Sequence, residues 1–590
     1  MIPSVLAQQM RQGVADFLRT TFPIATPFFR DILDKLLDED GGVFKEPYLS
    51  LQLPFLQRKG GADYFPEVPL EFPPYVHQEL AFERLGNTNP KSTIVATGTG
   101  SGKTECFLWP ILNYCYQNRD QDGIKAILIY PMNALATDQA ARIAKAIWHN
   151  DKLKSRISAG LFVGDKGSGP GTSMTETQVL TNRETMRLKP PDILLTNYKM
   201  LDYLLVRPKD FPIWQHNGPE TLRYLVVDEL HTFDGAQGTD LAYLVRRLKA
   251  RLKTPKHYLA AVGTSATLGG AEGQGEAKLL EFAGQVFHET FDDKAIIKEH
   301  RQRAGDFLEE SEIIHMHAPA AEKAADIDPN NYPNYDAYVR AQLGLWFGDE
   351  WIGIYDSDPD WRLRLGEALK TQVLFQNLIK ILAGRPWPYD ELLNRLEKGS
   401  VELRGAAKSY REDLLSSLVA LVSEARREVI DAAGHPRVVA FVDVRLQLWL
   451  RELRRMVVQV SREPRLRFAD DLTQNQVESH LPVVHCRECN SMGWGATRRR
   501  GQAKVHSDLR QFYSSFFSRS QDLVFLFPER TAALADGIDG APAKFCLSCL
   551  HLNGDTSVER CNECDAEDLL EVFVPDTRKR RGDSFHSTPD

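Results

Sequence analysis

The 590-residue sequence lacks any apolar run that approaches the ~18–20 residues needed to cross a bilayer. The residues that follow Met1 also lack a basic segment leading into a long apolar one, which argues against a secretion signal. An excess of basic charge is missing too, because the formal net charge is -8. A nucleic-acid partner would therefore have to bind local basic patches. Together these absences predict a cytoplasmic protein without a membrane partner.

Cysteine is scarce, with eight residues, but six of them form three Cys-x-x-Cys pairs. The pairs are Cys486 with Cys489, Cys546 with Cys549, and Cys561 with Cys564. In a chain without a secretion signal, such pairs favour a bound metal over disulfides. Eleven residues separate the last two pairs, a spacing that can place four thiolates tetrahedrally around a structural Zn²⁺. Cys486 and Cys489 could also ligate zinc, either with His485, His551 or residues beyond Asp590, or in place of a later pair.

The remaining composition is that of an ordinary globular protein, with 43% hydrophobic and 26% charged residues. The length predicts about three or four domains at roughly 150 residues each. We predict a helical lead-in at residues 1–60 and a nucleotide-binding lobe at 61–280. A helical insert follows at 281–435, and a basic, Cys-rich zinc-binding region at 436–590.

A Gly-rich stretch lies between a strand-like run and a helix-like run, which is the context of a phosphate-binding loop. Its residues are Thr97, Gly98, Thr99, Gly100, Ser101, Gly102, Lys103 and Thr104. Lys103 would reach the β and γ phosphates of ATP, and the Thr104 hydroxyl would bind Mg²⁺. The general pattern has glycine where this chain has Thr97, but three glycines still allow the loop to bend. The alternative is an ordinary turn between a strand and a helix.

Five short apolar runs that end in polar residues follow, with helix-like segments between them. They lie at residues 125–131, 160–165, 191–198, 224–231 and 260–267. This alternation is typical of a parallel α/β sheet, which binds ligands at the carboxyl ends of its strands. The sequence therefore predicts an α/β fold with a ligand site at that edge.

Two carboxylates follow the buried run at residues 224–227. Asp228 suits a ligand of the Mg²⁺ shell, and Glu229 suits a group that orients or deprotonates the attacking water. His231 could relay the state of hydrolysis to a neighbouring segment. The alternative is that these acids cap the next helix. Ser265, Ala266 and Thr267 end the last strand and could couple the acids to the far side of the cleft, although such residues also form turns.

Taken in this order, residues 97–104, 228–231 and 265–267 resemble motifs I, II and III of superfamily 2 helicases of the DEAD/DEAH type. Gln78 is similar to the adenine-reading glutamine of that family, although a lone glutamine is usually solvated. Pro131 and Asn133, and then Thr196 and Asn197, resemble its motifs that contact the nucleic-acid backbone. The resemblance implies a RecA-like parallel sheet with helices on both faces, and ATP, Mg²⁺ and a nucleic acid as ligands.

The stretch at residues 231–240 resembles a subgroup of large bacterial helicases with Cys-rich zinc-binding segments. Members occur in phage-defence systems such as DISARM and Druantia, and one is a mitomycin-repair helicase. These helicases use two RecA-like lobes, and the second brings an Arg-rich motif to the γ-phosphate. No such motif follows residue 275. We therefore expect the first lobe only, with the second beyond Asp590, on another chain, or lost by truncation.

Basic residues gather at four places, namely residues 246–253, 451–467, 498–500 and 578–581. A single charge run is usually a solvated face, but four in an acidic chain favour a nucleic-acid track.

Two functions remain open from the sequence. The first is an ATP-dependent nucleic-acid helicase or translocase, with DNA favoured, that acts with a second lobe or with other defence or repair subunits. The alternative is a nucleic-acid-binding zinc scaffold that binds nucleotide but does not hydrolyse it alone.

Overall fold

The computed structural model describes the chain except residues 40, 58–63, 71, 99, 165–170, 266–273, 310, 383, 401–402, 431–434, 488, 529–538, 577–584 and 587–590. Thr99, Ala266, Thr267 and the basic run at 578–581 thus lie outside the described residues. The chain divides into two compact units. The sheet unit comprises Leu53–Glu310 and Arg426–Phe441, and the mixed unit comprises Met1–Gln52, Ser311–Ala425 and Val442–Asp590.

The sheet unit is built on seven strands in the order β4-β5-β3-β6-β7-β2-β8, and every pairing between neighbours is parallel. The strands are β2 (Thr93–Ala96), β3 (Ala126–Ile129), β4 (Ala159–Phe162), β5 (Ile193–Thr196), β6 (Tyr224–Val227), β7 (Ala260–Ser265) and β8 (Ile296–Lys298). The predicted RecA-like parallel sheet is confirmed. Because β8 pairs with β2, the sheet continues past residue 280, where the predicted lobe ends.

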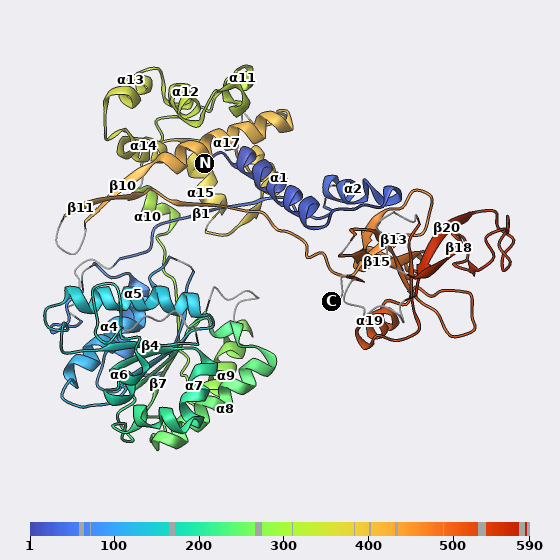
Figure 1. The fold of residues 1–590 in the computed structure, drawn as a ribbon. Helices are drawn as coiled ribbons and strands as arrows, with labels where there is room; N and C mark the ends of the chain where they lie inside the picture. Colours follow the sequence, from blue (N-terminus) through green and yellow to red (C-terminus); the bar gives the residue numbers. More distant parts are fainter. Residues whose placement is uncertain are drawn as a thin grey trace. The chain divides into compact units, whose positions relative to one another are not determined.

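Helices cover both faces of this sheet (Figure 1). The helices of the sheet unit beside this sheet are α3 (Val76–Leu85), α4 (Lys103–Gln117), α5 (Asn133–His149), α6 (Arg183–Leu188), α7 (Tyr198–Val206), α8 (Gly235–Leu252) and α9 (Gln274–Phe287), with the 3-10 turns η2 (Pro208–Trp214) and η3 (Leu230–Thr232). Helix α10 (Ala304–Leu308) follows the last strand, and its Phe307 ring packs against Phe441.

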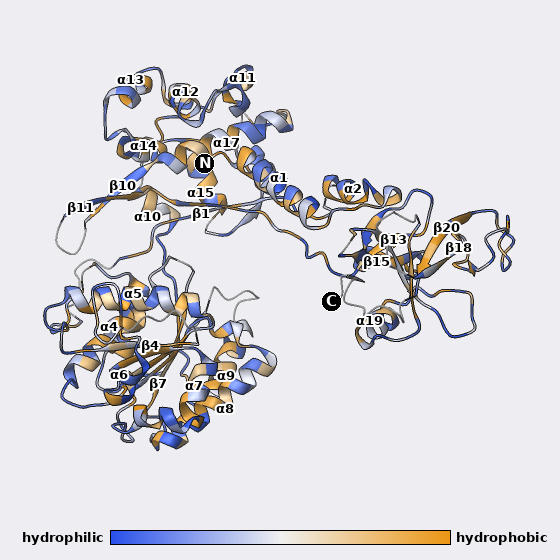
Figure 2. Cartoon of the chain, in the orientation of Figure 1, coloured by the Kyte–Doolittle hydropathy of each residue, from blue (hydrophilic) through white to orange (hydrophobic). Residues whose placement is uncertain are grey.

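The strands β2 to β7 are buried at every position and are mostly apolar, because helices cover both of their faces (Figure 2). Ala126 and Leu128 of β3 belong to the core that contains α4 and α5. Ile127 and Ile129 belong to the opposite core, which contains α7 and α8. Successive side chains of a strand point to opposite faces, so one short run supports both helical layers.

The mixed unit carries the helices predicted for the middle of the chain. Its helices are α1 (Pro3–Thr21), α2 (Ile32–Asp38), α11 (Ala324–Ile327), α12 (Tyr335–Phe347), α13 (Glu350–Ser357), α14 (Trp361–Lys370), α15 (Val373–Leu382), α16 (Tyr389–Gly399), α17 (Lys408–Glu424), α18 (Gln474–Val477) and α19 (Leu509–Ser518). Helix α17 is buried at every position from 414 to 422, since α1, α11, α12, α14 and α16 pack around it.

A small sheet in the mixed unit joins segments that are far apart in the sequence. β1 (Tyr48–Gln52) pairs with β12 (Asp443–Gln447) on one side and with β9 (Trp387–Pro388) on the other. The predicted helical lead-in thus contains a strand. Its apolar residues at 49 and 51 alternate with polar ones, but its partners are too distant in sequence for local spacing to reveal the pairing.

The C-terminal part of the mixed unit consists mainly of antiparallel strands. One sheet has the order β14-β13-β15-β16-β17 with β21 paired to β15, and another has the order β19-β18-β20. These strands are β13 (Met456–Gln459), β14 (Leu466–Phe468), β15 (His480–Cys486), β16 (Met492–Thr497), β17 (Leu523–Leu526), β18 (Gly540–Cys546), β19 (Leu552–Asn553), β20 (Leu569–Pro575) and β21 (Phe585–His586). The hairpin of β10 (Arg426–Ile430) and β11 (Pro436–Ala440) belongs to the sheet unit.

Within the part of the chain that the structure describes, none of the helices has the length and apolar character that crossing a membrane requires.

Candidate active site and metal centre

The Gly-rich loop joins β2 to α4 at the carboxyl edge of the sheet. Gly100 and Gly102 have φ values of +78° and +77°, in the left-handed region that favours glycine. A Cβ at Gly102 would clash with the side-chain amide of Gln78. The departure at Thr97 is accommodated, because Thr97 is buried and its hydroxyl lies 2.7 Å from that of Ser101. The described part of the loop therefore has the bends that an anion-binding loop needs before a helix N-terminus.

Helix α3 holds this loop through two buried polar side chains. His77 Nε2 lies 2.8 Å from the Ser101 carbonyl oxygen. The Gln78 amide donates to the Gly102 carbonyl oxygen at 3.2 Å and accepts from the Tyr75 N–H at 2.9 Å. Both ends of the Gln78 amide are thus engaged, one with the loop and one with the cap of α3. Its predicted contact with adenine stays a prediction.

Lys103 and Glu229 form an ion pair of 3.0 Å at the mouth of the site. Glu229 adopts a left-handed backbone conformation, with φ of +49°, and its N–H donates to the Thr264 hydroxyl oxygen at 2.9 Å. The Thr264 hydroxyl in turn donates to Asp228 Oδ1 at 2.5 Å. Thr264 therefore fixes both acids. Sequence reasoning missed it because it lies just before the motif at 265–267 and no short pattern distinguishes it.

Asp228 lies at the end of β6, and burial raises the pKa of its carboxyl group, although the Thr264 hydrogen bond opposes this shift. The Thr104 hydroxyl stands on the first turn of α4, which begins at Lys103. A hydroxyl and a carboxylate are oxygen donors of the kind that Mg²⁺ takes. The residues predicted to hold Mg²⁺ thus have suitable chemistry.

His231 connects the acidic motif to the end of β7. Its Nδ1 lies 3.4 Å from Glu229 Oε2 and 3.4 Å from the Ser265 hydroxyl. The structure therefore brings together two motifs that lie more than 30 residues apart in the sequence. This contact is the geometry that a relay between the acids and the third motif needs.

Glu299 and Arg301, which follow β8, are site residues that the sequence analysis missed. Glu299 Oε2 accepts a hydrogen bond from the Gly98 N–H at 3.1 Å, and Arg301 donates to Glu299 Oε1 at 2.9 Å. Arg301 also lies 3.9 Å from the ring centroid of Phe55. Burial raises the pKa of the Glu299 carboxyl, but the Arg301 and Gly98 hydrogen bonds outweigh it, so the net shift is downward. The ionised Glu299 carboxylate therefore accepts the hydrogen bond of one backbone N–H group of the loop.

The residues predicted to contact nucleic acid lie on two neighbouring strand ends. The Asn197 side chain donates to Asn133 Oδ1 at 2.7 Å, and its own oxygen caps α7 by accepting from the Met200 N–H. Thr196 is buried and its hydroxyl donates to the Phe162 carbonyl oxygen, which keeps that hydroxyl from the surface. Pro131, which follows β3, is partly exposed. The roles of these four residues stay predictions.

Comparison with family models gives the same interpretation of the site. Residues 75–273 match the model of the DEAD/DEAH box helicase family. The chain carries a DEAD/DEAH box helicase domain. The match begins at the cap of α3 and contains the loop, the acids and Thr264.

The relatives of this helicase domain are much longer than the part they share with it. The Druantia protein DruE of Escherichia coli is 28% identical, over 34% of this chain and 16% of its own length. An uncharacterized ATP-dependent helicase of Methanocaldococcus jannaschii is 32% identical, over 34% of this chain and 26% of its own length. A crystal structure of the helicase MrfA with DNA and AMPPNP is 20% identical, with a TM-score of 0.32, and the match covers 54% of this chain and 44% of that one.

The mixed unit holds a cluster of four thiols, separate in sequence from the helicase domain. The sulfur atoms of Cys546, Cys549, Cys561 and Cys564 all lie within 4.8 Å of one another. Two of the contacts, Cys546 to Cys564 and Cys549 to Cys561, measure 3.6 Å. Zn–S bonds of about 2.3 Å in a tetrahedron separate sulfur atoms by about 3.8 Å, so the cluster fits a structural zinc site.

The thiol of Cys561 is suited to metal binding. Burial raises its pKa, but hydrogen bonds from the backbone of Cys564 and Glu563 and from neighbouring thiols lower it to about 7. The cluster does not include Cys486 or Cys489. Cys489 donates to the Ser491 hydroxyl at 3.2 Å, and His485 Nε2 lies 3.0 Å from the Pro23 carbonyl oxygen. Zinc binding by the first pair stays a prediction.

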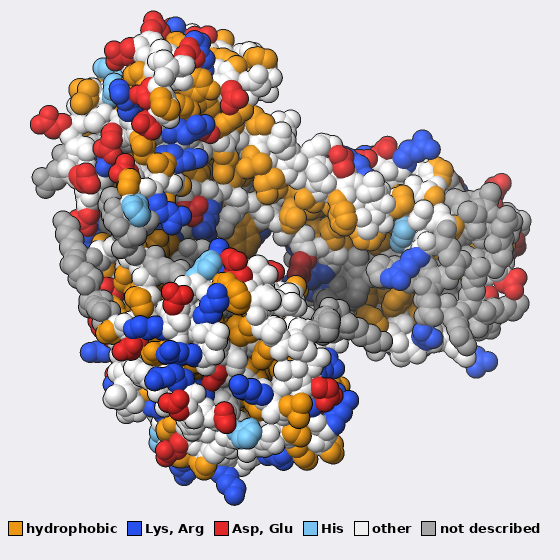
Figure 3. All heavy atoms as spheres, turned by 60° about the vertical axis from the view of Figure 1, so that its left-hand side comes forward, with side chains coloured by type: hydrophobic (Ala, Val, Ile, Leu, Met, Phe, Trp, Pro, Cys, Tyr) orange, Lys and Arg blue, Asp and Glu red, His pale blue; other side chains and the backbone are white. Residues whose placement is uncertain are grey.

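Most arginines of the basic group at 451–467 are paired with carboxylates. The pairs are Arg451 with Asp471, Arg454 with Glu452, Arg455 with Asp470, Arg462 with Asp568, and Arg467 with Glu39. Arg465 is exposed and has no ion-pair partner among the described residues. Figure 3 likewise shows Lys and Arg interspersed with Asp and Glu on the visible face. The basic group is therefore less available to phosphates than its sequence indicates.

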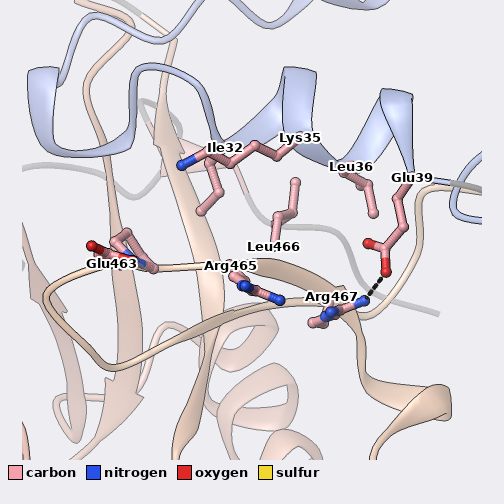
Figure 4. Close-up of a pocket in the computed structure, with 9 residues that line it drawn as sticks. Ile32, Lys35, Leu36, Glu39, Glu463, Arg465, Leu466 and Arg467 are labelled. Carbon is pink, nitrogen blue, oxygen red and sulfur yellow. Dashed lines mark hydrogen bonds and ion pairs between the residues drawn. The ribbon is translucent and has the colours of Figure 1, made fainter.

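Arg465 lines a pocket of about 260 Å³ between α2 and β14 (Figure 4). Ile32, Leu36 and Leu466 form the apolar part of the lining, Glu463 adds a carboxylate, and Arg467 is held by Glu39 at 2.6 Å. Lys35 lies on the helix that borders the pocket and, like Arg465, has no ion-pair partner in the described part of the chain. These two cations are therefore the ones at this pocket that remain available to an anion.

Zinc content tests the four-thiol cluster. We expect purified chain to carry about one zinc ion, and Cys561→Ser to reduce the content to less than about a tenth of that, because three thiolates hold Zn²⁺ poorly. Cys489→Ser is the matched control and should keep the full content. Elemental analysis by mass spectrometry measures both. Loss of metal from Cys489→Ser, with Cys561→Ser unaffected, would contradict the assignment.

Removal of the Glu299 charge tests its position at the loop. Glu299→Gln should bind ATP about 3- to 10-fold more tightly, because a negative charge beside the predicted phosphate position is removed. Glu276→Gln, which alters an acid paired with Lys298 at 2.5 Å, is the control and should bind like wild type. Titration with a fluorescent ATP analogue measures the affinity. Weaker binding by Glu299→Gln would mean that the carboxylate contacts the nucleotide instead.

Proposed function

We propose that this chain hydrolyses ATP with its helicase domain and couples hydrolysis to movement along a nucleic acid, with DNA favoured. The observation that carries the proposal is the convergence of Lys103, Asp228 and Glu229 at one edge of a parallel sheet. Lys103 pairs with Glu229, and Thr264 bonds to both acids. The relatives named ATP-dependent helicases support the same activity.

The ion pair between Lys103 and Glu229 must open for turnover. When a triphosphate enters, Lys103 exchanges the carboxylate for phosphate oxygens, and Glu229 is released to orient a water molecule. Mg²⁺ held by Thr104 and Asp228 would neutralise charge on the phosphates. His231 contacts both Glu229 and Ser265, so a movement of Glu229 away from Lys103 would also change its contact with His231.

The biological setting is also a proposal. The resemblance to a Druantia protein supports a role in defence against phage, and the wider resemblance of the sequence leaves DNA repair open. A second RecA-like lobe would complete the γ-phosphate site, so we expect this chain alone to hydrolyse ATP more slowly than it would beside that lobe. We propose that this lobe comes from a longer form of the protein or from another subunit.

The scaffold alternative has one observation in its favour. In this structure the predicted water-orienting acid is neutralised by the predicted phosphate-binding lysine at 3.0 Å. If Lys103 and Glu229 stayed paired when nucleotide binds, Glu229 would not orient a water molecule, and the lobe would bind nucleotide without hydrolysing it. The two functions therefore differ in whether the bound ATP is hydrolysed.

ATP hydrolysis by the full chain tests the proposed activity. We expect hydrolysis that single-stranded DNA stimulates, and a loss of at least about 100-fold in Lys103→Ala and in Glu229→Gln, because charge stabilisation and water activation are removed. Lys152→Ala, which breaks an exposed pair with Glu67, should behave as wild type. Phosphate release with DNA, with RNA and without either gives the rates. Equal rates for wild type and Lys103→Ala would favour the scaffold.

Nucleic-acid affinity tests the pocket between α2 and β14. The double variant Lys35→Ala with Arg465→Ala should weaken DNA binding and reduce the slope of log affinity against log salt by about 1 to 2, because each phosphate contact releases counterions. Arg462→Ala is the control, since Arg462 is already paired with Asp568 at 2.9 Å. Fluorescence anisotropy at several salt concentrations measures the slope. An unchanged slope in the double variant would mean that Lys35 and Arg465 do not contact the nucleic acid.

A further inference from the structure

Helix α5 is attached to the phosphate-loop helix α4 by two polar contacts. The Thr104 hydroxyl donates to Gln139 Oε1 at 3.3 Å. In the next position along α4, Glu105 is almost fully buried and forms an ion pair with Arg142. Gln139 and Arg142 lie three residues apart, so they project from neighbouring positions of the same face of α5. The predicted Mg²⁺ ligand is thus held by a residue of another helix.

The direction of the Thr104 hydrogen bond matters for metal binding. A hydroxyl has one hydrogen to donate and two lone pairs to offer. With the hydrogen directed at Gln139, the lone pairs of Thr104 stay free for a cation. Without Gln139, the hydroxyl can donate to a carbonyl oxygen of the preceding turn, as threonines in helices do, and the lone pairs then point elsewhere.

Helix α5 also begins at a residue predicted to contact nucleic acid. Asn133 is its first residue, about 9 Å along the helix axis from Gln139, and it accepts a hydrogen bond from Asn197 at 2.7 Å. One rigid helix therefore carries the partner of Thr104 and one half of the Asn133–Asn197 pair. A movement of α5 at Asn133 would therefore also move Gln139, and a movement at Gln139 would also move Asn133.

From these contacts we propose that Gln139 is a positioning residue for the Thr104 hydroxyl and links the Mg²⁺ site to the nucleic-acid edge through α5. This proposal rests on the proposed function, since it needs nucleotide bound with Mg²⁺ at Thr104. Partners that orient a metal ligand typically change metal affinity by 10–100-fold when they are removed. Gln139 acts through Thr104 and does not touch the reacting atoms.

The test compares Gln139→Leu with Gln139→Glu. Leucine keeps the size of the side chain but removes the acceptor, whereas glutamate keeps an oxygen acceptor at the same reach. Asp138→Asn, an exposed neighbour on α5, is the control. The readout is the Mg²⁺ concentration that gives half-maximal binding of a fluorescent ADP analogue, with a second titration in EDTA. A thermal unfolding scan shows whether each variant is folded.

We expect Gln139→Leu to need about 10-fold more Mg²⁺, with unchanged binding in EDTA. Gln139→Glu and Asp138→Asn should titrate within about twofold of wild type. A purely structural role would weaken binding in EDTA as well, and Gln139→Glu would not restore the titration. Either that pattern or a wild-type titration by Gln139→Leu would overturn the proposal.

The outcome also separates this proposal from the proposed function. Wild-type chain that binds nucleotide with Mg²⁺, next to an unaffected Gln139→Leu, would reject the role of Gln139 alone. Wild-type chain that shows no Mg²⁺-dependent nucleotide binding would reject the proposed function and the role of Gln139 with it.

Discussion

The parallel pairing of seven short strands is the constraint on which the candidate site depends. Parallel strands bring all of their carboxyl ends to one edge of the sheet. β6, β7 and β2 are neighbours in that order in the sheet. The strand pairing therefore brings the Gly-rich loop, the two acids and Ser265 to the same place. The strands can pair in this way because both of their faces are buried under helices. The grouping of these site residues at one edge of the sheet therefore depends on the burial of both sheet faces under helices.

The polar groups at this edge of the sheet form hydrogen bonds and ion pairs with one another. Lys103 is paired with Glu229, the Gly98 N–H with Glu299, and the Thr104 hydroxyl with Gln139. A buried donor without a hydrogen-bond partner costs about 1–3 kcal/mol, so these internal partners stabilise the unliganded lobe. Two of the three partners are carboxylates, which compete with an incoming triphosphate. Nucleotide binding is thus an exchange of partners.

Local sequence was sufficient for the features that depend on neighbouring residues. The loop at 97–104 and the acids at 228 and 229 were predictable because glycine spacing and strand-end acids are local patterns. Thr264, Glu299 and Gln139 were not, because each acts on a motif 35 residues or more away in the sequence. The pairing of β1 with β12 was hidden for the same reason, and so was the neutralisation of Arg467 by Glu39. The four-thiol cluster was predictable from spacing alone, but not the separate position of Cys486 and Cys489.

The pairing of β1 with β12 also has a consequence for synthesis. About 390 residues separate the two strands, and ribosomes add about 5–20 residues per second, so β1 leaves the ribosome about 20–80 seconds before its partner. The seven-stranded sheet can fold during that interval, since all seven of its strands lie between residues 93 and 298. Until β12 arrives, the apolar side chains of Leu49 and Leu51, which are buried in the finished protein, lack that part of their cover. The nascent chain therefore carries an unpaired strand edge of the kind that chaperones shield.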